Sequence, residues 1–456
     1  NVSGTTSLVA GGNGAIVTFA TAASTFNALS ASGDDRVVVD VAITTDTGNL
    51  ALDGDLDNAA DTNDNIAVAA GLTLTSAGSI TLDATTGNIT GAGALTLNAA
   101  AGVTLNDGLT TAGATVIDAD TDDNGAGTFT LAASKALSTT ANTLSITADD
   151  IALSGTVNTA GSTTTLLVSD GGTIGLGATA GNMTISGAEL QNITTTSLVI
   201  GDTTSGNITV DGITAANSNN ISGTVTLNAT AAGASLSFSN TASTFNAVTA
   251  NADNRISVNA NLTADAGHLR LEGDADNAAD GNDDIRFAAG VTVTAANTLF
   301  LDATTGGMTG LGALTLNAGN GISLPDNLTT AGATVIDADT NDNGSGTFSI
   351  SAAKALSTTG NTLSITADDI TITGTINSGA AATTILVSDG GTIGLGATAG
   401  NMTISGAELQ NITATGLTVG DTTAGSITVN GITAANSNNV SGTTSLVAGG
   451  NGAIVT

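Results

Sequence analysis

Two aspartate-rich segments contain the side chains of this sequence that are best suited to chemistry, and each segment occurs twice. The first segment and its copy contain the candidate ligands Asp53, Asp55, Asp57, Asp61 and Asp64, and Asp274, Asp276, Asp280 and Asp283. The second segment and its copy contain Asp118, Asp120, Asp122, Asp123 and Asn124, and Asp337, Asp339, Asn341 and Asp342. Closely spaced carboxylate and amide oxygens are the ligands that Ca²⁺ prefers. The pattern therefore makes Ca²⁺ the candidate cofactor.

The spacing of these acids leaves two interpretations open. It is not the spacing of an EF-hand loop, because Asp123 stands where that loop needs Gly and no bidentate Glu follows. The alternative to a Ca²⁺ site is a solvated turn, in which Asp and Asn side chains accept hydrogen bonds from nearby backbone N–H groups.

Other residues suited to catalysis are scarce. His268 is the only histidine, and Asn49 takes its place in the first half of the chain. Arg36 and Arg255 each follow acidic residues, which predicts local ion pairs at turns. The chain has no Trp or Tyr on which a sugar could stack. We therefore expect no catalytic residues and no enzymatic activity.

The composition excludes further classes of partner. Lys and Arg number 6 against 39 Asp and Glu, so the net charge is −33, which would repel nucleic acid. The chain has no Cys, which excludes disulfides and thiolate metal sites. No apolar run approaches the roughly 18–20 residues of a membrane-spanning helix. Hydrophobic residues nevertheless make up 41% of the chain, which indicates a folded protein rather than a disordered acidic tail.

The chain repeats itself on a scale that determines its fold class. Residues 439–456 are identical to residues 1–18, and each span of 438 residues divides into two similar halves. This predicts a first copy at 1–219, a second at 220–438 and the start of a third at 439–456. We expect the chain to be part of a longer periodic polypeptide.

Short phrases with a period of two residues fill each copy. An aliphatic residue, Thr or Ser, and another aliphatic residue alternate, as in Leu95-Thr96-Leu97, and Gly, Asn and Asp bound the phrases. This predicts an all-β parallel β-helix, a right-handed and continuous rod with about ten coils in each copy. A sandwich or barrel fits the strands equally well, but long tandem copies favour end-to-end stacking. The predicted inward residues are Ile80, Leu82, Leu95, Leu97, Leu144, Ile146, Leu314 and Leu316, and the predicted outward ones are Thr81, Thr96 and Thr315.

Three phrases resemble the repeats of filamentous-haemagglutinin-like bacterial surface proteins. They are GSITLDATTGNITG at 78–91, GALTLNAAAGVTL at 93–105 and NTLSITADDIALSGTVNTAG at 142–161. The resemblance implies a right-handed β-helix, secretion across an outer membrane, and a role as an adhesin or extracellular fibre.

The repeat and the resemblance together predict a non-catalytic structural filament, extracellular or at the cell surface. Its expected partners are further copies of the same repeat, joined end to end, with lateral self-association as a further option. One alternative is the shaft of a large adhesin whose binding tip lies outside this segment. A third is an ice-binding solenoid with outward Thr ladders, although the phrases that start at 80, 95 and 144 are unevenly spaced.

Overall fold

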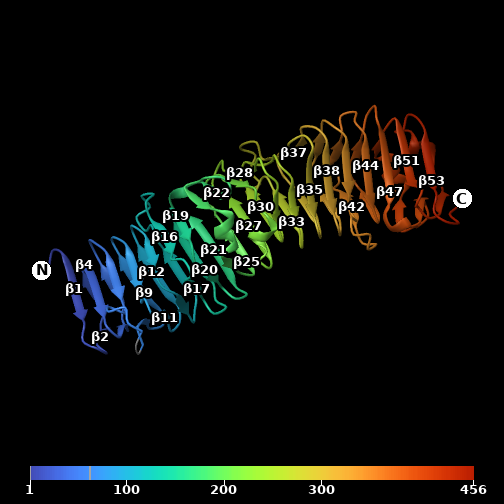
Figure 1. Cartoon of the computed structure of the whole chain (residues 1–456). Coiled ribbons are helices and arrows are strands. Elements are labelled where there is room, and N and C mark those ends of the chain that lie inside the picture. Colours follow the sequence, from blue (N-terminus) through green and yellow to red (C-terminus); the bar gives the residue numbers. More distant parts are fainter. Residues whose placement is uncertain (1, 61–62) are drawn as a thin grey trace. The chain divides into compact units, whose positions relative to one another are not determined.

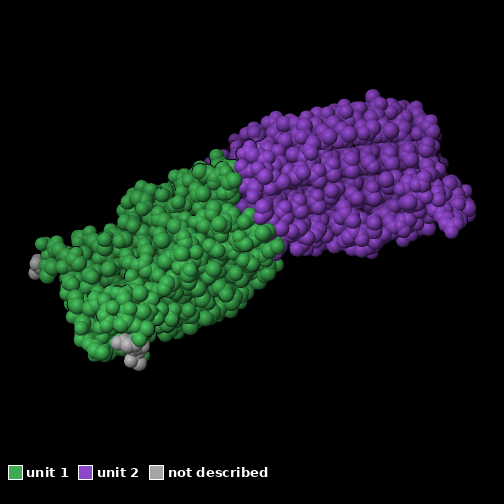
Figure 2. Space-filling model, in the orientation of Figure 1, with its two compact units in different colours: residues 1–209, 216–231 green, residues 210–215, 232–456 purple. Residues whose placement is uncertain are grey.

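The computed structural model describes residues 2–60 and 63–456 of the chain. It is all-β, and its short parallel strands form the stacked coils of a parallel β-solenoid, as the sequence predicts. The chain divides into two compact units (Figure 2), with residues up to 209 and 216–231 in unit 1 and residues 210–215 and 232–456 in unit 2. The strands of each unit lie side by side in successive coils (Figure 1).

Three parallel sheets form most of unit 1 among the described residues. The first sheet consists of β1 (Thr5–Ala10), β4 (Ala28–Gly33), β7 (Leu50–Asp53), β10 (Ile80–Asp83), β13 (Val103–Leu105), β16 (Thr128–Leu131) and β19 (Asp150–Leu153). The second consists of β2 (Ile16–Phe19), β5 (Arg36–Val39), β8 (Asn65–Val68), β11 (Ile89–Gly91), β14 (Leu109–Thr111), β17 (Ala136–Ser138), β20 (Thr156–Asn158) and β24 (Ile193–Thr194). The third contains β3 (Ser24–Phe26), β6 (Ile43–Thr45), β9 (Leu72–Ser76), β12 (Leu95–Ala99), β15 (Thr115–Asp118), β18 (Leu144–Ala148), β21 (Thr163–Val168), β25 (Ser197–Ile200) and β27 (Thr224–Ala229).

Unit 2 is built in the same way. One sheet contains β30 (Ala247–Ala252), β33 (Leu269–Glu272), β36 (Leu299–Asp302), β39 (Ile322–Leu324), β42 (Thr347–Ile350) and β45 (Asp369–Ile372). Another contains β28 (Ser235–Phe238), β31 (Arg255–Val258), β34 (Asp284–Phe287), β37 (Gly307–Gly310), β40 (Leu328–Thr330), β43 (Ala355–Ser357), β46 (Thr375–Asn377) and β50 (Ile412–Thr413). The remaining strands are β29 (Ser243–Phe245), β32 (Leu262–Ala264), β35 (Val291–Ala295), β38 (Leu314–Ala318), β41 (Thr334–Asp337), β44 (Leu363–Ala367), β47 (Ala382–Val387), β51 (Gly416–Asp421) and β53 (Thr444–Ala448), with β48 (Ile393–Gly396), β49 (Met402–Ile404) and β52 (Ile427–Asn430) in a small sheet.

The inward and outward assignment is confirmed. Leu97 is fully buried and lies in register with Leu74 of one neighbouring coil and Ile117 of the other, and the other seven predicted inward residues are also buried. Thr96 is half-buried on the opposite side of the same strand, and Thr81 and Thr315 are half-buried in the same way. The coils therefore stack like on like, so that aliphatic side chains form the core.

Short helices interrupt the strands where the sequence predicts none. They are α1 (Gly187–Gln191), α2 (Ala215–Ser218), α3 (Gly406–Gln410) and α4 (Ala434–Ser437), with 3-10 turns at Ser169–Gly171 and Ser388–Gly390. β22 (Ile174–Gly177), β23 (Met183–Ile185) and β26 (Ile208–Asp211) lie around the first two helices in sequence. None of the four exceeds five residues, and no helix of the described residues is long and apolar enough to cross a membrane.

A capping box explains α1. The Ser186 hydroxyl accepts the N–H of Glu189 at 3.2 Å, and the Glu189 carboxylate accepts the N–H of Ser186 at 2.9 Å. The other carboxylate oxygen accepts the N–H of Leu153 in β19 at 3.1 Å. This hydrogen bond ties α1 to β19, which precedes it in the sequence. Ser405 and Glu408 repeat the same box at α3.

One copy does not correspond to a whole number of coils. The phrase of β1 lies in the first sheet of unit 1, whereas its copy 219 residues later, β27, lies in the third sheet of the same unit. Among the described residues the first copy contributes eight strands to the third sheet, β3 to β25, rather than about ten, because the aspartate-rich segments and the α1 segment lengthen their coils. The repeat therefore moves a given surface group from one side of the solenoid to another.

Candidate cation-binding loops

The first aspartate-rich segment forms a loop between two sheets. In unit 1 it connects β7 to β8, and in unit 2 its copy connects β33 to β34. Asp55 and Asp64 are buried in unit 1, as are Asp274 and Asp283 in unit 2. Asp57, Asp276 and Asp280 are exposed, Asp53 is half-buried, and Asp61 lies outside the described residues. Burial thus separates the predicted ligands into an inner pair and a solvated rim.

The inner pair in unit 2 converges on one residue of the next coil. Oδ2 of Asp274 accepts the Thr305 N–H at 2.6 Å, and Oδ2 of Asp283 accepts the Thr305 hydroxyl at 3.3 Å. Oδ2 of Asp283 also accepts the N–H groups of Asp280 and Gly281, each at 3.2 Å. Both carboxylates therefore lie beside Thr305.

In unit 2, one oxygen of each inner carboxylate has no hydrogen-bond donor among the described residues. Oδ1 of Asp274 and Oδ1 of Asp283 are buried without a hydrogen-bond partner, and these residues are 0% and 4% exposed. Asp55 of unit 1 shows the same arrangement, because its Oδ2 accepts the Thr86 N–H at 2.7 Å while its Oδ1 is buried without a partner. A buried charged oxygen without a donor is costly.

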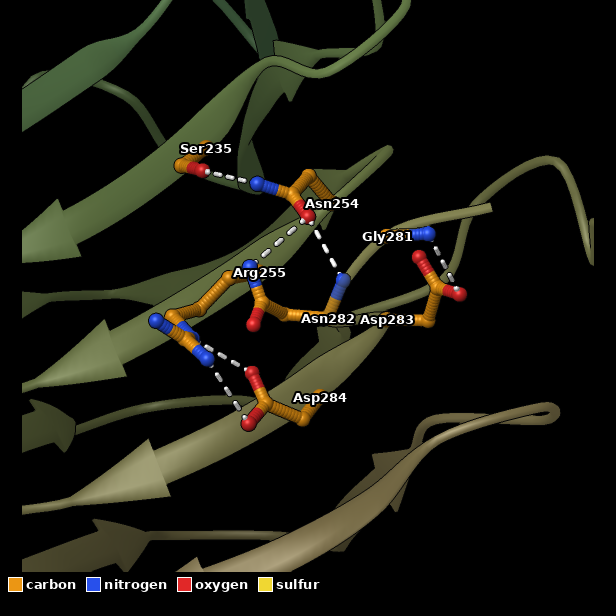
Figure 3. A network of polar contacts seen from close by, with 7 residues as sticks. All are labelled: Ser235, Asn254, Arg255, Gly281, Asn282, Asp283 and Asp284. Atoms are coloured by element: carbon orange, nitrogen blue, oxygen red, sulfur yellow. Dashed lines mark hydrogen bonds and ion pairs between the residues drawn. The ribbon is translucent and has the colours of Figure 1, made fainter. Parts of the chain in front are cut away.

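A polar network holds the end of the unit 2 loop in place (Figure 3). Oδ1 of Asn254 accepts the N–H of Asn282 at 2.9 Å, and its side-chain amide donates to the Ser235 hydroxyl at 3.2 Å. Arg255 donates from Nε and a terminal nitrogen to the two carboxylate oxygens of Asp284, at 2.5 and 3.1 Å. The residues on either side of Asp283 are therefore tied to Asn254 and to Arg255, the first residue of β31.

This ion pair corrects the expectation of local pairs at turns. The partner of Arg255 is Asp284 on the next coil, in register across β31 and β34, rather than an acid beside it in the sequence. In unit 1 the equivalent partner position is Asn65, and the Arg36 Nε is buried without a hydrogen-bond partner. The register of stacked coils, rather than sequence proximity, determines which charges meet.

The second aspartate-rich segment makes a different loop, which leads from β15 to β16 in unit 1. Asp120 is fully buried, and its carboxylate accepts the N–H groups of Asn124 and Gly125 at 3.4 and 3.3 Å and the Ser169 hydroxyl at 2.7 Å. Asp118 accepts the N–H of Asp120 at 3.2 Å, and Asp122 accepts the side-chain amide of Asn124 at 2.9 Å, while Asp123 is exposed.

The copy of this loop follows β41 and repeats its contacts. Asp339 accepts the Asn343 N–H at 3.3 Å and the Ser388 hydroxyl at 2.6 Å, and Asp337 accepts the N–H of Asp339 at 3.2 Å. Asn341 and Asp342 are exposed. Both oxygens of the buried Asp339 carboxylate thus accept a hydrogen bond from the protein, which is the arrangement of a capped turn.

Within residues 2–60 and 63–456, no three His, Asp or Glu side chains are placed so that they could hold a metal ion. Ca²⁺ binding at these loops stays a prediction, and the described residues offer at most two carboxylates for one such site. His268 is exposed and contacts Thr298 and Asn297, at 2.6 and 3.2 Å, away from both loops.

Two further ion pairs join residues that the sequence pattern does not predict to be neighbours. Lys135 pairs with Asp107, and Lys354 pairs with Asp326, in both cases across 28 residues of sequence. The Asp107 side chain is only 2% exposed, and its second oxygen accepts the N–H of Ala84 at 2.9 Å. The recurrence of the two lysines at equivalent positions was the available signal.

Repulsion between acids of neighbouring coils leads to a prediction for Asp149. Its pKa is raised, first by burial and then by the negative charges of Asp120 and Asp150. A raised folded pKa means that the stability contributed by Asp149 is present below 3.8 and lost as the pH rises through the folded value. We expect Asp149→Asn to raise the free energy of unfolding by about 0.5 kcal/mol at pH 7, and less at pH 3. Guanidinium unfolding at both pH values measures this.

Asp211 in unit 2 provides the matched control of opposite sign. The side-chain amide of Asn240 and then the N–H of Thr241, against the effect of burial, lower the pKa of Asp211. Its contribution is present above 3.8 and is lost as the pH falls through the lower folded value. Asp211→Asn should therefore cost about 1 kcal/mol at pH 7, and less at pH 3. A loss of stability in Asp149→Asn at pH 7 would contradict the assignment of repulsion.

No family model matches this sequence, and comparisons with curated proteins and with solved structures find no match.

Proposed function

We propose that this chain is a segment of a non-catalytic structural filament, assembled from tandem copies of one β-solenoid repeat. The observation that carries the proposal is how the second copy begins. Leu227 of the second copy is fully buried and lies in register with Ile200 of the first copy. The second copy therefore continues the stack of coils that the first copy forms, so further copies end to end are the fitting partners.

Repeated internal contacts support the same proposal. The ion pair of Lys135 with Asp107 recurs as Lys354 with Asp326, and the bond from Ser169 to Asp120 recurs from Ser388 to Asp339. Each added copy can therefore bring the same stabilising interactions. A single coil fixes about 20 residues at a cost of ~1–2 kcal/mol each, which its few aliphatic side chains do not offset alone. Long arrays of coils are the stable form of such a chain.

The displacement of successive copies favours a fibre over an ice-binding surface. An ice-binding surface needs one flat lattice of Thr side chains on one side. In unit 1, however, the β1 phrase and its copy β27 lie in different sheets. A given Thr phrase is therefore not repeated along one side, and every side of a filament presents similar groups. This arrangement also suits lateral association in more than one direction.

An extracellular or bacterial cell-surface location belongs to the same proposal. The phrase at residues 142–161 resembles repeats of bacterial surface fibres, and acidic residues outnumber basic ones by 39 to 6. Labelling of intact cells with an antibody against the repeat tests the location. We expect labelled surface fibres, and label found only after lysis would overturn it.

Imaging of native material tests the filament itself. We expect long filaments of uniform width and a single periodicity in negative-stain micrographs. A short shaft that ends in a distinct head would instead establish the adhesin alternative. Separate particles of a few copies, with neither filament nor head, would contradict both.

A further inference from the structure

The buried oxygens of the first aspartate-rich loop point to a ligand. We propose that the loop between β33 and β34 binds one Ca²⁺ ion through the carboxylates of Asp274 and Asp283. Both carboxylates contact Thr305 through Oδ2, and both keep a buried Oδ1 that no donor of the described residues reaches. The proposal does not rest on the filament function, since it concerns one loop of unit 2.

The two kinds of loop in this chain provide an internal comparison. Asp339 in the second loop is also fully buried, but a backbone N–H and the Ser388 hydroxyl satisfy its two oxygens. Asp274 is equally buried and has a donor for one oxygen only. Burial of a carboxylate therefore does not by itself leave an oxygen without a partner in this fold. The second loop supplies the N–H of Asn343 to Oδ1 of Asp339, and no described residue supplies such a donor to Oδ1 of Asp274.

Negative charge accumulates around the same place. The exposed rim adds the carboxylates of Asp276 and Asp280, and Asp280 lies against Asp283, whose Oδ2 accepts its N–H at 3.2 Å, so several negative charges repel one another here. No Lys or Arg forms an ion pair with Asp274 or Asp283 among the described residues. A cation between the inner carboxylates would relieve this repulsion.

The donor set selects the kind of cation. The ligands are oxygens only, which excludes a preference for zinc or copper. Two carboxylates leave most positions to carbonyl oxygens and water, an arrangement that the flexible coordination of Ca²⁺ tolerates better than the strict octahedron of Mg²⁺. With so few protein charges we expect a dissociation constant of about 10⁻⁴–10⁻³ M, in the range of extracellular Ca²⁺ modules.

The next coil holds the loop in position. Gly306 follows Thr305, and a Cβ on Gly306 would lie 1.9 Å from the carbonyl oxygen of Asp283, so only glycine permits this approach. In unit 1, Asp55 and Thr86 occupy the positions equivalent to Asp274 and Thr305, and the Oδ1 of Asp55 is likewise buried without a partner. The feature therefore belongs to the repeat rather than to one copy.

The experiment compares two double variants of the whole 456-residue chain. Asp274→Asn with Asp283→Asn removes the inner carboxylates, and Asp276→Asn with Asp280→Asn removes two exposed acids of the same loop, with the same change in net charge. Equilibrium dialysis with radioactive Ca²⁺ at physiological NaCl should show one ion fewer for the inner variant and no change for the rim variant. Equal losses in both variants would mean diffuse counter-ion binding and would overturn the proposal.

Thermal melting gives an independent measurement on the same proteins. Saturating Ca²⁺ should raise the melting temperature of the wild-type transition by about 5 °C over chelator. The inner variant should lose part of this rise, and it should be at least as stable as the wild type in chelator, since it no longer buries two repelling charges. If the inner variant fails to fold, Asp283→Asn alone replaces it. Identical wild-type curves in Ca²⁺ and in chelator would refute the site.

Discussion

Replacing Leu97 with Asp is expected to lower the free energy of unfolding by roughly 4–5 kcal/mol, because it removes core packing and buries an unpaired charge. Leu97 is fully buried between Leu74 and Ile117 of the adjacent coils. Neither neighbouring strand, β9 or β15, contains a Lys or Arg that could pair with a new carboxylate. Far-UV circular dichroism during guanidinium unfolding measures the change, since the chain has no Trp or Tyr for fluorescence.

Thr96→Asp is the matched control for this substitution. Thr96 is the preceding residue of β12 and is half-buried on the outer side, in register with Thr73 and Val116. A carboxylate there remains solvated, so we expect a change below about 1 kcal/mol. A larger loss for Thr96→Asp than for Leu97→Asp would mean that the inward and outward sides are assigned the wrong way round.

Lys135→Met is expected to lower the free energy of unfolding by about 3 kcal/mol, because it leaves the buried charge of Asp107 without its partner. The Asp107 side chain is 2% exposed, so water cannot take the place of the ammonium group. Removing both charges, as Lys135→Met with Asp107→Leu, should recover most of the loss. Denaturant unfolding of the single and double variants gives the two differences.

The copy in unit 2 provides a second test of the same pair. Burial raises the pKa of Asp326, but the Lys354 ammonium and other donors outweigh it, so the pKa lies below its usual value. Lys354→Met should therefore destabilise unit 2 in the same direction as Lys135→Met destabilises unit 1. If the single Lys135 variant is as stable as the wild type, the buried pair has no stabilising role.

The strand pattern was predictable because it depends on local alternation. Leu97 and Thr96 alternate as neighbours in a strand must, and repetition of the phrase predicts that like residues stack. The short helix α1 was missed although its signal, Ser186 followed three residues later by Glu189, is present. Because the surrounding segment is rich in Gly and Thr, its weak helix propensity argued against a helix in spite of this single capping box.

Contacts between coils were not predictable from the sequence. Asp107 meets Lys135 across 28 residues, whereas Arg255 meets Asp284 across 29, and each separation depends on the loops within one coil. For the same reason the sequence could not distinguish the two aspartate-rich loops. Asp120 is satisfied by Ser169, 49 residues away, while Asp274 depends on Thr305, 31 residues away. Only the register of the coils shows which carboxylate keeps an oxygen without a donor.

X-ray fibre diffraction from oriented native filaments tests the central claim most directly, that tandem copies stack their coils along the filament axis. We predict a strong meridional reflection at ~4.8 Å, from coils spaced along the axis. The first copy contributes eight strands to the third sheet and part of a further coil among the described residues, which also predicts a long axial spacing of roughly 40 Å for each copy. A 4.8 Å reflection on the equator, or none at all, would show that the strands do not stack along the filament and would contradict the account.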